Sequence, residues 1–238
     1  MKLQGVIFDM DGVLCDSEPF IYEASRRMFV ETYGINPKEE DFFPFVGAGE
    51  DRFIGGVAEK YGIRLDAERD KARTYAIYLE IIRGKLEPLP GVGEFVGRCR
   101  ERGLKIAVAS AADAVKVNGN LRQIGLTAET FDAVLTGNDV RRKKPDPEIF
   151  LAAAARLGLR AENCLVIEDA PNGLRAGKTA GAACLGITTK FDAATLRAAG
   201  ADWTAPDLAH APEEVFGGAD AEGNDVFAAK RRKKEKQP

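Results

Sequence analysis

The amino-acid sequence predicts an α/β protein, with a parallel sheet covered by helices and an all-helical segment inserted after the first strand. Short apolar runs alternate with segments of helical periodicity through most of the chain, which is typical of a parallel sheet with helices on its faces. From about residue 18 to about residue 86 the alternation stops, because three helical patterns follow one another with no strand between them. The sequence therefore predicts a sheet-containing core and a helical insertion.

Five expected strands are short and apolar on both faces, as buried parallel strands are. Two covering helices are recognised by their periodicity: "GVGEFVGRCRERG" stops at Gly103, and "PEIFLAAAARLG" stops at Gly158. Strands and helices in this order predict a Rossmann-like core. The expected strands cover residues 3–8, 104–109, 133–135, 164–167 and 183–187.

The helical insertion is bounded by "CDSEP" on one side and "LEPLPG" on the other. We expect these two linkers to hinge the insertion over the sheet as a cap. The predicted units are a core of residues 1–17 and 87–216 and a cap of residues 18–86. Residues 217–238 end in the like-charge run "KRRKKEKQP", for which a flexible solvated tail is favoured over an anion-binding or targeting element.

Composition and charge restrict the classes of function. With 45% hydrophobic and 30% charged residues, the sequence is that of an ordinary soluble globular protein, and a net charge of −3 gives no reason to expect nucleic acid as a partner. The four cysteines lie far apart, which argues against a disulfide framework and favours a reducing compartment. No apolar run is long enough for membrane insertion. We expect a monomer or weak oligomer.

Carboxylates follow two of the expected strands. Asp9 and Asp11 come directly after the first strand, and Gly12 allows the backbone to pass close to a bound group. Glu168 and Asp169 follow the strand at 164–167 in the same way. Like charges brought to one edge of a sheet repel each other, so a bound cation is the natural compensation, and an all-oxygen ligand set suits magnesium.

Two further residues are of the kind that binds phosphate. Ser110 ends the strand at 104–109 with a small hydroxyl donor, and Lys144 precedes Pro145 at the start of a helix. A hydroxyl, a lysine and helix N-terminal amides are the groups that phosphate recognition uses. Each residue alone would be read as an ordinary strand end or surface residue. Four such elements in order after strands or loops favour a phosphoryl site.

With these motifs the sequence resembles the haloacid dehalogenase superfamily of aspartate-nucleophile phosphotransferases. The resemblance covers about residues 2–216 and rests on "DMDGV", "VAS", "KKPDPEIF" and "VIEDAPNG". The helical insertion further resembles the β-phosphoglucomutase-like and phosphosugar phosphatase branch. Within it, "FDMDGVLCDSE" and "FFPFVGAGEDRFIGGVAEKYG" are similar to the phosphatase-like domain of plant and algal chloroplast proteins of the suppressor-of-quenching type. The expected compartment is therefore the cytoplasm or the chloroplast stroma.

The resemblance implies a two-step phosphoryl transfer. Asp9 would attack phosphorus, and Asp11 would protonate the leaving oxygen and later take a proton from water. Ser110 and Lys144 would hold the phosphoryl oxygens, with Lys143 as the rival lysine. Magnesium would be held by the Asp9 carboxylate, the Asp11 main-chain carbonyl and Asp169, with Glu168 acting mainly through water.

The implied substrate is a small phosphorylated metabolite, and its expected contacts are Gly12, Glu18, Ala111 and Arg52. In β-phosphoglucomutases a histidine follows the first motif near the start of the cap, and a lysine and an arginine that bind a second phosphate flank the cap's glycine loop. Those places hold Ile21, Val46 and Glu50 in this sequence. An apolar residue and an acid cannot bind that second phosphate, which favours hydrolysis over mutase activity.

Three functions stay open on the sequence. The favoured one is a magnesium-dependent phosphatase acting through an aspartyl phosphate. A phosphosugar mutase is the second. A phosphate-binding regulatory domain without turnover is the third, and it is the weakest because no catalytic residue of the motifs is missing.

Overall fold

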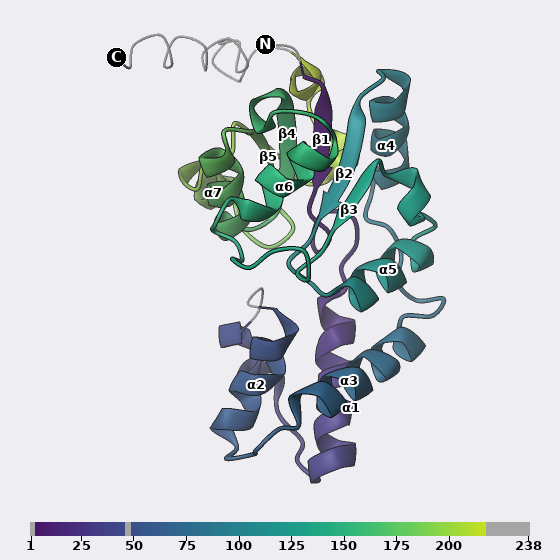
Figure 1. Ribbon diagram of the computed structural model, residues 1–238, viewed down its shortest axis with the longest axis vertical. Coiled ribbons are helices and arrows are strands. Elements are labelled where there is room, and N and C mark those ends of the chain that lie inside the picture. The colour runs from purple at the N-terminus through teal and green to yellow at the C-terminus, as the bar shows by residue number, and fades with distance from the viewer. Residues whose placement is uncertain (1–2, 46–48, 218–238) are drawn as a thin grey trace.

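The computed structural model, which describes residues 3–45 and 49–217, contains one parallel sheet in the order β3-β2-β1-β4-β5-β6 (Figure 1). This arrangement confirms the predicted α/β, Rossmann-like fold. The sixth strand was not predicted, because its sequence Trp-Thr-Ala is short and is interrupted by a polar residue. The strands are β1 Gly5–Phe8, β2 Lys105–Ala109, β3 Ala133–Leu135, β4 Cys164–Glu168, β5 Ala183–Ile187 and β6 Trp203–Ala205.

The register of the central strands brings the motif residues to one edge. Phe8 of β1 pairs with Ile167 of β4 and with Val108 of β2, so the three strands end at nearly the same level. The Asp9 amide continues the ladder by donating a hydrogen bond to the Ile167 carbonyl at 2.9 Å. The side chains that follow these strands therefore meet at the carboxyl edge of the sheet, where ligands bind in open α/β folds.

Helices cover both faces of the sheet. Alternate residues of β1 face opposite cores: Phe8 packs with the α4 and α5 side, and Ile7 packs with the α6, α7 and α8 side. This double covering explains why the strands are apolar on both faces. The helices are α4 Val92–Glu101, α5 Ala114–Gln123, α6 Glu148–Arg156, α7 Pro171–Ala180 and α8 Ala193–Ala198. Short 3₁₀ turns cover Ala128–Thr130, Ala161–Asn163, Leu208–His210 and Glu213–Phe216.

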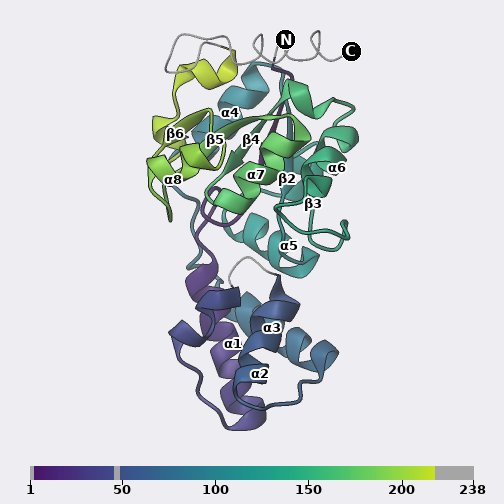
Figure 2. The same cartoon turned by 90° about the vertical axis from the view of Figure 1, so that its left-hand side faces the viewer.

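The insertion contains only helices, as predicted, and lies beyond the carboxyl edge of the sheet (Figure 2). Its aromatic core includes Phe42, which lies 4.9 Å from Phe53 and 6.3 Å from Phe29 between ring centroids. Boundaries at residues 18 and 86 remain our proposal. The elements are α1 Glu18–Tyr33, α2 Glu50–Lys60 and α3 Ala67–Ile81, with 3₁₀ turns at Glu39–Asp41 and Phe43–Phe45.

Two features seat the cap on the core. The linkers run side by side, since Cys15 and Pro88 form an antiparallel bridge and the Leu89 amide donates to the Leu14 carbonyl at 3.0 Å. Helix α3 of the cap also packs on α5 of the core, where the buried Tyr78 hydroxyl donates a hydrogen bond to the Asn120 side chain. The cap therefore has a defined position over the carboxyl edge.

Further expectations concern the membrane, the cysteines and the tail. Over residues 3–45 and 49–217 no helix combines the length and the apolar character that crossing a bilayer requires. All four cysteines are buried, and none of them forms a disulfide. Apart from Gly217, the predicted flexible tail lies outside the described residues.

Candidate active site

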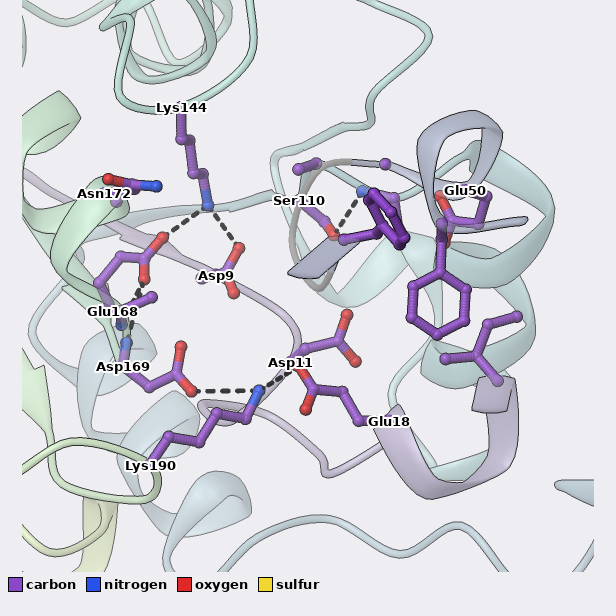
Figure 3. A pocket seen from close by; sticks show the side chains of 18 of the residues that line it. Asp9, Asp11, Glu18, Glu50, Ser110, Lys144, Glu168, Asp169, Asn172 and Lys190 are labelled. Carbon is purple, nitrogen blue, oxygen red and sulfur yellow. Dashed lines mark hydrogen bonds and ion pairs between the residues drawn. The ribbon is translucent and has the colours of Figure 1, made fainter. Parts of the chain in front are cut away.

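A cavity of about 450 Å³ lies between the cap and the carboxyl edge of the sheet. It brings together the motif residues that the sequence places far apart (Figure 3). The core side of its wall includes Asp9, Asp11, Ser110, Ala111, Lys144, Glu168 and Asp169, and the cap side includes Glu18, Ile21, Phe43, Phe45, Glu50 and Phe53.

Lys144 is the cation at the centre of the site. Its Nζ lies 2.5 Å from Asp9 Oδ1 and 2.7 Å from Glu168 Oε1, and it also donates to the Ala109 carbonyl at 3.1 Å. Burial acts to lower the pKa of Lys144, but the charges of Asp9 and Glu168 raise it above its ordinary value. Lys143 turns away, with its Nζ 2.6 Å from the Gly137 carbonyl. The structure thus brings Lys144, and not Lys143, to Asp9.

Three carboxylates gather beside this lysine. Within the described residues, Asp9, Glu168 and Asp169 each offer an oxygen, and these oxygens all lie within 4.8 Å of one another. Burial raises the pKa of Asp9 to about 7 while Lys144 opposes the rise, and burial raises the pKa of Asp169 well above its ordinary value while Lys190 opposes it.

The donor set of this cluster fits a hard divalent cation. It contains carboxylate oxygens only, with no nitrogen or sulfur ligand, and a cation would offset both the burial and the mutual repulsion that raise the pKa values. The Asp11 carboxylate is not part of the cluster. The role of the Asp11 main-chain carbonyl as a magnesium ligand stays a prediction.

Two glycines let the backbone pass close to these carboxylates. A Cβ on Gly12 would lie 1.9 Å from Asp169 Oδ2, and Gly12 has a φ of +75°, which favours glycine. A Cβ on Gly173 would lie 1.8 Å from Glu168 Oε1. Gly12 does not line the cavity itself, and its role as a substrate contact stays a prediction.

The Asp11 carboxylate is held on both oxygens. The Ser17 hydroxyl donates to Oδ1, and Lys116 Nζ lies 3.0 Å from Oδ2. Burial acts to raise the pKa of Asp11, but Lys116 and Ser17 together hold it below its ordinary value. Asp11 therefore belongs to a different electrostatic group from Asp9, although only one residue separates them.

Ser110 is buried on the opposite side of Asp9 from Glu168 and Asp169 (Figure 3). Its amide donates to the Leu135 carbonyl at 3.1 Å, and its Oγ accepts a hydrogen bond from the Ala112 amide at 3.2 Å. Ala111, between them, lines the cavity. The loop after β2 thus presents a hydroxyl and main-chain groups to the cavity.

Sequence reasoning missed Lys190 and Lys116. Lys190 Nζ lies 2.5 Å from Glu18 Oε1 and 3.5 Å from Asp169 Oδ2. The rule that found Asp9 would also have found Lys190, because it lies three residues beyond the end of β5. Lys116 gave a weaker signal, a charged residue one turn before Asn120 on the buried face of α5.

Arg52, a predicted substrate contact, lies in α2 of the cap. Its guanidinium lies 4.9 Å from the ring centroid of Phe45 and forms an ion pair with Glu59 at 2.7 Å, and its side chain is half exposed. The ring of Phe45 lines the cavity and Arg52 does not. Of the positions that differ from the mutases, Ile21 and Glu50 line the cavity, and Val46 lies outside the described residues.

A capped parallel sheet with an aspartate, a lysine and a carboxylate cluster at its carboxyl edge has the features of an aspartate-dependent phosphate enzyme. Comparison with known proteins gives the family. The model of the haloacid dehalogenase-like hydrolases matches residues 3–181. The chain therefore belongs to the haloacid dehalogenase-like hydrolase family.

Three similar proteins place the chain within this family. Protein SUPPRESSOR OF QUENCHING 1, chloroplastic, of Arabidopsis thaliana is 39% identical over 228 residues, 94% of this chain but 22% of that relative. The phosphorylated carbohydrates phosphatase of Thermotoga maritima is 34% identical over 179 residues, 75% of this chain and 82% of the relative. A solved structure from Thermotoga maritima, described as a candidate β-phosphoglucomutase, has a TM-score of 0.70 at 32% identity, covering 90% of this chain and 97% of that chain.

These matches confirm the predicted superfamily, its β-phosphoglucomutase-like branch and the enzyme class, a phosphatase of the superfamily. The chain spans about a fifth of the Arabidopsis relative, so the match concerns one region of that protein.

Proposed function

We propose that this protein is a magnesium-dependent phosphatase that hydrolyses a small phosphorylated metabolite through an aspartyl phosphate on Asp9. The observation that carries the proposal is the position of Asp9, which pairs with a buried lysine and belongs to a carboxylate cluster suited to a cation, at the wall of a cavity. The similarity to a phosphorylated carbohydrates phosphatase supports the same function.

In the first step an Asp9 carboxylate oxygen bonds to phosphorus, and the bond from phosphorus to the leaving oxygen breaks. Lys144 neutralises charge on the phosphoryl oxygens, and Ser110 donates a hydrogen bond to them. Asp9, Glu168, Asp169 and the Asp11 carbonyl would hold magnesium, which when bound supplies further positive charge next to the phosphoryl group. The chain's own cation and hydroxyl thus surround the proposed nucleophile.

Asp11 provides the proton chemistry in this proposal. In the free site the pKa of Asp11 is held below its ordinary value, so its carboxylate takes up a proton as substrate binds. It then passes this proton to the departing oxygen, and the product leaves as an alcohol. The resulting carboxylate then takes a proton from water as that water attacks phosphorus, which breaks the bond to Asp9 and releases inorganic phosphate. The Asp11 carboxyl group therefore regains in each cycle the proton that it gave to the leaving group.

The cap wall favours hydrolysis over the mutase alternative. Ile21 offers no hydrogen-bond donor, and the Glu50 carboxylate would repel a second phosphate. The likeness to a candidate β-phosphoglucomutase keeps the mutase as the alternative to be tested. The cavity, of about 450 Å³, has a size that is usual for small-molecule sites.

A panel of phosphorylated sugars, polyols and short acids with magnesium tests the proposal. Release of inorganic phosphate is expected, and it should stop in excess chelator and return with magnesium but not with zinc. A coupled assay with β-glucose 1-phosphate and a bisphosphate primer measures the alternative. If sugar 1- and 6-phosphates interconvert faster than phosphate is released, the protein is a mutase.

We also propose a reducing compartment, the cytoplasm or the chloroplast stroma. Four buried cysteines without disulfides support it, as does the chloroplastic relative. A small metabolite is the proposed partner of a monomer or weak oligomer, and light scattering of the purified protein tests the oligomeric state.

A further inference from the structure

Lys116 lies where a lysine is doubly unfavourable. It is in the first turn of α5, where the helix dipole repels a cation, and its side chain is only 5% exposed. Burial of an ammonium group is tolerated only when it is paired. The partners of Lys116 therefore explain why a lysine is present.

These partners come from the core and from the cap. Lys116 Nζ lies 3.0 Å from Asp11 Oδ2 and 3.9 Å from Oε1 of Glu50, the first residue of α2. Glu50 is buried, and its second oxygen has no hydrogen-bond partner, so Lys116 is its one ion-pair partner among the described residues. One ammonium group thus bridges the proposed acid and the cap.

We propose that Lys116 is a positioning residue that holds the Asp11 carboxyl group for proton transfer to the leaving oxygen, and that Glu50 links this position to the seating of the cap. The inference rests on the proposed function of the site. Lys116 acts through Asp11 and needs no contact with the phosphoryl group.

The reason is geometric. Asp11 lies in the turn after β1, and its carboxyl orientation is set by one contact on each oxygen, the Ser17 hydroxyl and Lys116. Without the Lys116 ammonium group, Asp11 Oδ2 loses its hydrogen-bond donor, so the carboxyl group can rotate away from the leaving oxygen. A misplaced acid slows only those reactions in which the leaving group needs a proton.

The test compares two substrates in Lys116→Met. An alkyl phosphate such as glycerol phosphate leaves as a poor alkoxide and needs the acid, whereas p-nitrophenyl phosphate leaves as a stable phenolate. The quantity to compare is kcat/KM, because it ends at the first irreversible step, before water attacks the aspartyl phosphate. We expect a loss of about 10- to 100-fold for the alkyl phosphate and of less than about threefold for the aryl phosphate.

Lys71→Met is the matched control. Lys71 also bridges cap and core, through Asp51 at 2.7 Å and Asp113 at 3.1 Å, but it does not line the cavity. Its loss should not change the ratio of the two kcat/KM values. Two outcomes would overturn the proposal, because both would show that only the stability of the cap–core contact matters. One is a similar change of this ratio in Lys71→Met, and the other is an equal loss for both substrates in Lys116→Met.

Glu50→Gln is a second test variant. In it the buried Lys116 keeps its partner Asp11, so no charge is left without a counter-charge. The substitution keeps the side-chain shape and removes the charge, so it should lower the alkyl-to-aryl ratio in the same direction by a smaller factor. In the double variant the two effects should not multiply, because both act through one ammonium group. Multiplying effects, or an unchanged ratio in Glu50→Gln, contradict the link to the cap.

The wild-type protein separates this inference from the proposed function. If it hydrolyses neither substrate with magnesium, the proposed function fails. If it hydrolyses both and Lys116→Met keeps the wild-type ratio, only the role of Lys116 is wrong. Circular dichroism and thermal unfolding of each variant verify that the compared proteins are folded.

Discussion

Lys144 Nζ lies 2.5 Å from Asp9 Oδ1, although 135 positions separate the two residues along the chain. The contact depends on the sheet: Asp9 follows β1, and Glu168, the other partner of Lys144, ends the neighbouring strand β4. Both carboxylates therefore point at one ammonium group. The ion-pair network at the site is a direct consequence of strand order.

Asp9→Asn should remove turnover and leave the fold intact. The amide keeps the shape of the side chain but offers no anionic oxygen to attack phosphorus, so kcat for p-nitrophenyl phosphate should fall at least about 10³-fold. Asp16→Asn, at an exposed acid of the same loop, is the control and should keep wild-type kcat. Turnover within tenfold of wild type in Asp9→Asn would exclude this residue as the nucleophile.

Magnesium should raise the unfolding temperature of the wild-type protein. Binding to the folded state alone adds about 1.4 kcal/mol at a concentration ten times Kd, which corresponds to a shift of about 3–5 °C for a chain of this size. Asp169→Asn should abolish the shift, because it removes one of the three clustered carboxylates. Scanning calorimetry with and without magnesium measures both. An equal shift in the variant places the metal elsewhere.

Gly173→Ala should damage the site although alanine is the better helix former. The new Cβ would lie 1.8 Å from Glu168 Oε1, and Glu168 cannot move freely because it accepts from Lys144 and from the amides of Asp169 and Ala170. We expect kcat to fall at least about tenfold, with a smaller magnesium-induced shift.

Gly97→Ala in α4 is the matched control for that glycine, since its Cβ would meet no atom within 4 Å. It should keep wild-type kcat and stabilise the protein by about 0.5–1 kcal/mol through helix propensity alone. If both substitutions stabilise the protein and leave kcat unchanged, the close approach of Gly173 to Glu168 has no functional consequence.

The sequence predicted the elements with a strong local signal. The strand at 183–187 has the predicted bounds, and β1 is two residues shorter than predicted. Asp9 and Glu168 were found because the rule that places ligands at carboxyl strand ends needs only strand positions. Strand β6 was missed because the polar Thr204 interrupts its three residues, whereas the equally short strand at 133–135 is wholly apolar.

Side-chain direction was harder to predict than backbone position. Arg52 follows the cap's glycine loop in the sequence, yet its guanidinium lies over the ring of Phe45 and does not line the cavity. Lys116 was not singled out from the sequence, because only tertiary packing shows that its end reaches Asp11. Such contacts join segments that lie far apart in the sequence, so a local pattern does not reveal them.

Arg52→Ala should therefore leave KM within about twofold of wild type for every good substrate, since the lost contacts are a half-exposed ion pair and a ring stack outside the cavity. Phe53→Ala is the comparison, because Phe53 lines the cavity and packs on Phe42. Steady-state kinetics over the substrate panel measures both. A selective rise in KM in Arg52→Ala would return this arginine to the substrate site.

Asp41 predicts a pH dependence of stability that originates in the cap. Hydrogen bonds from Lys60 and Tyr61 lower the pKa of Asp41 to about 2, and the Lys38 amide also donates to its carboxylate at 2.9 Å. In the unfolded chain an aspartate has a pKa of about 3.9. The folded state therefore holds the charged form more strongly. Its contribution is fully present above the unfolded value and is lost as the pH falls from about 4 to about 2.

Asp41→Asn should lower the free energy of unfolding by about 1–2 kcal/mol at pH 7. The difference between wild type and variant should shrink as the pH falls through 4 towards 2, because wild-type Asp41 then becomes neutral like the asparagine. Urea unfolding of both proteins at several pH values measures this difference, and the titration of every other group cancels in the comparison. A difference that stays constant from pH 7 to pH 2.5 would show that the Asp41 contacts stabilise the cap through shape and hydrogen bonding without a contribution from charge.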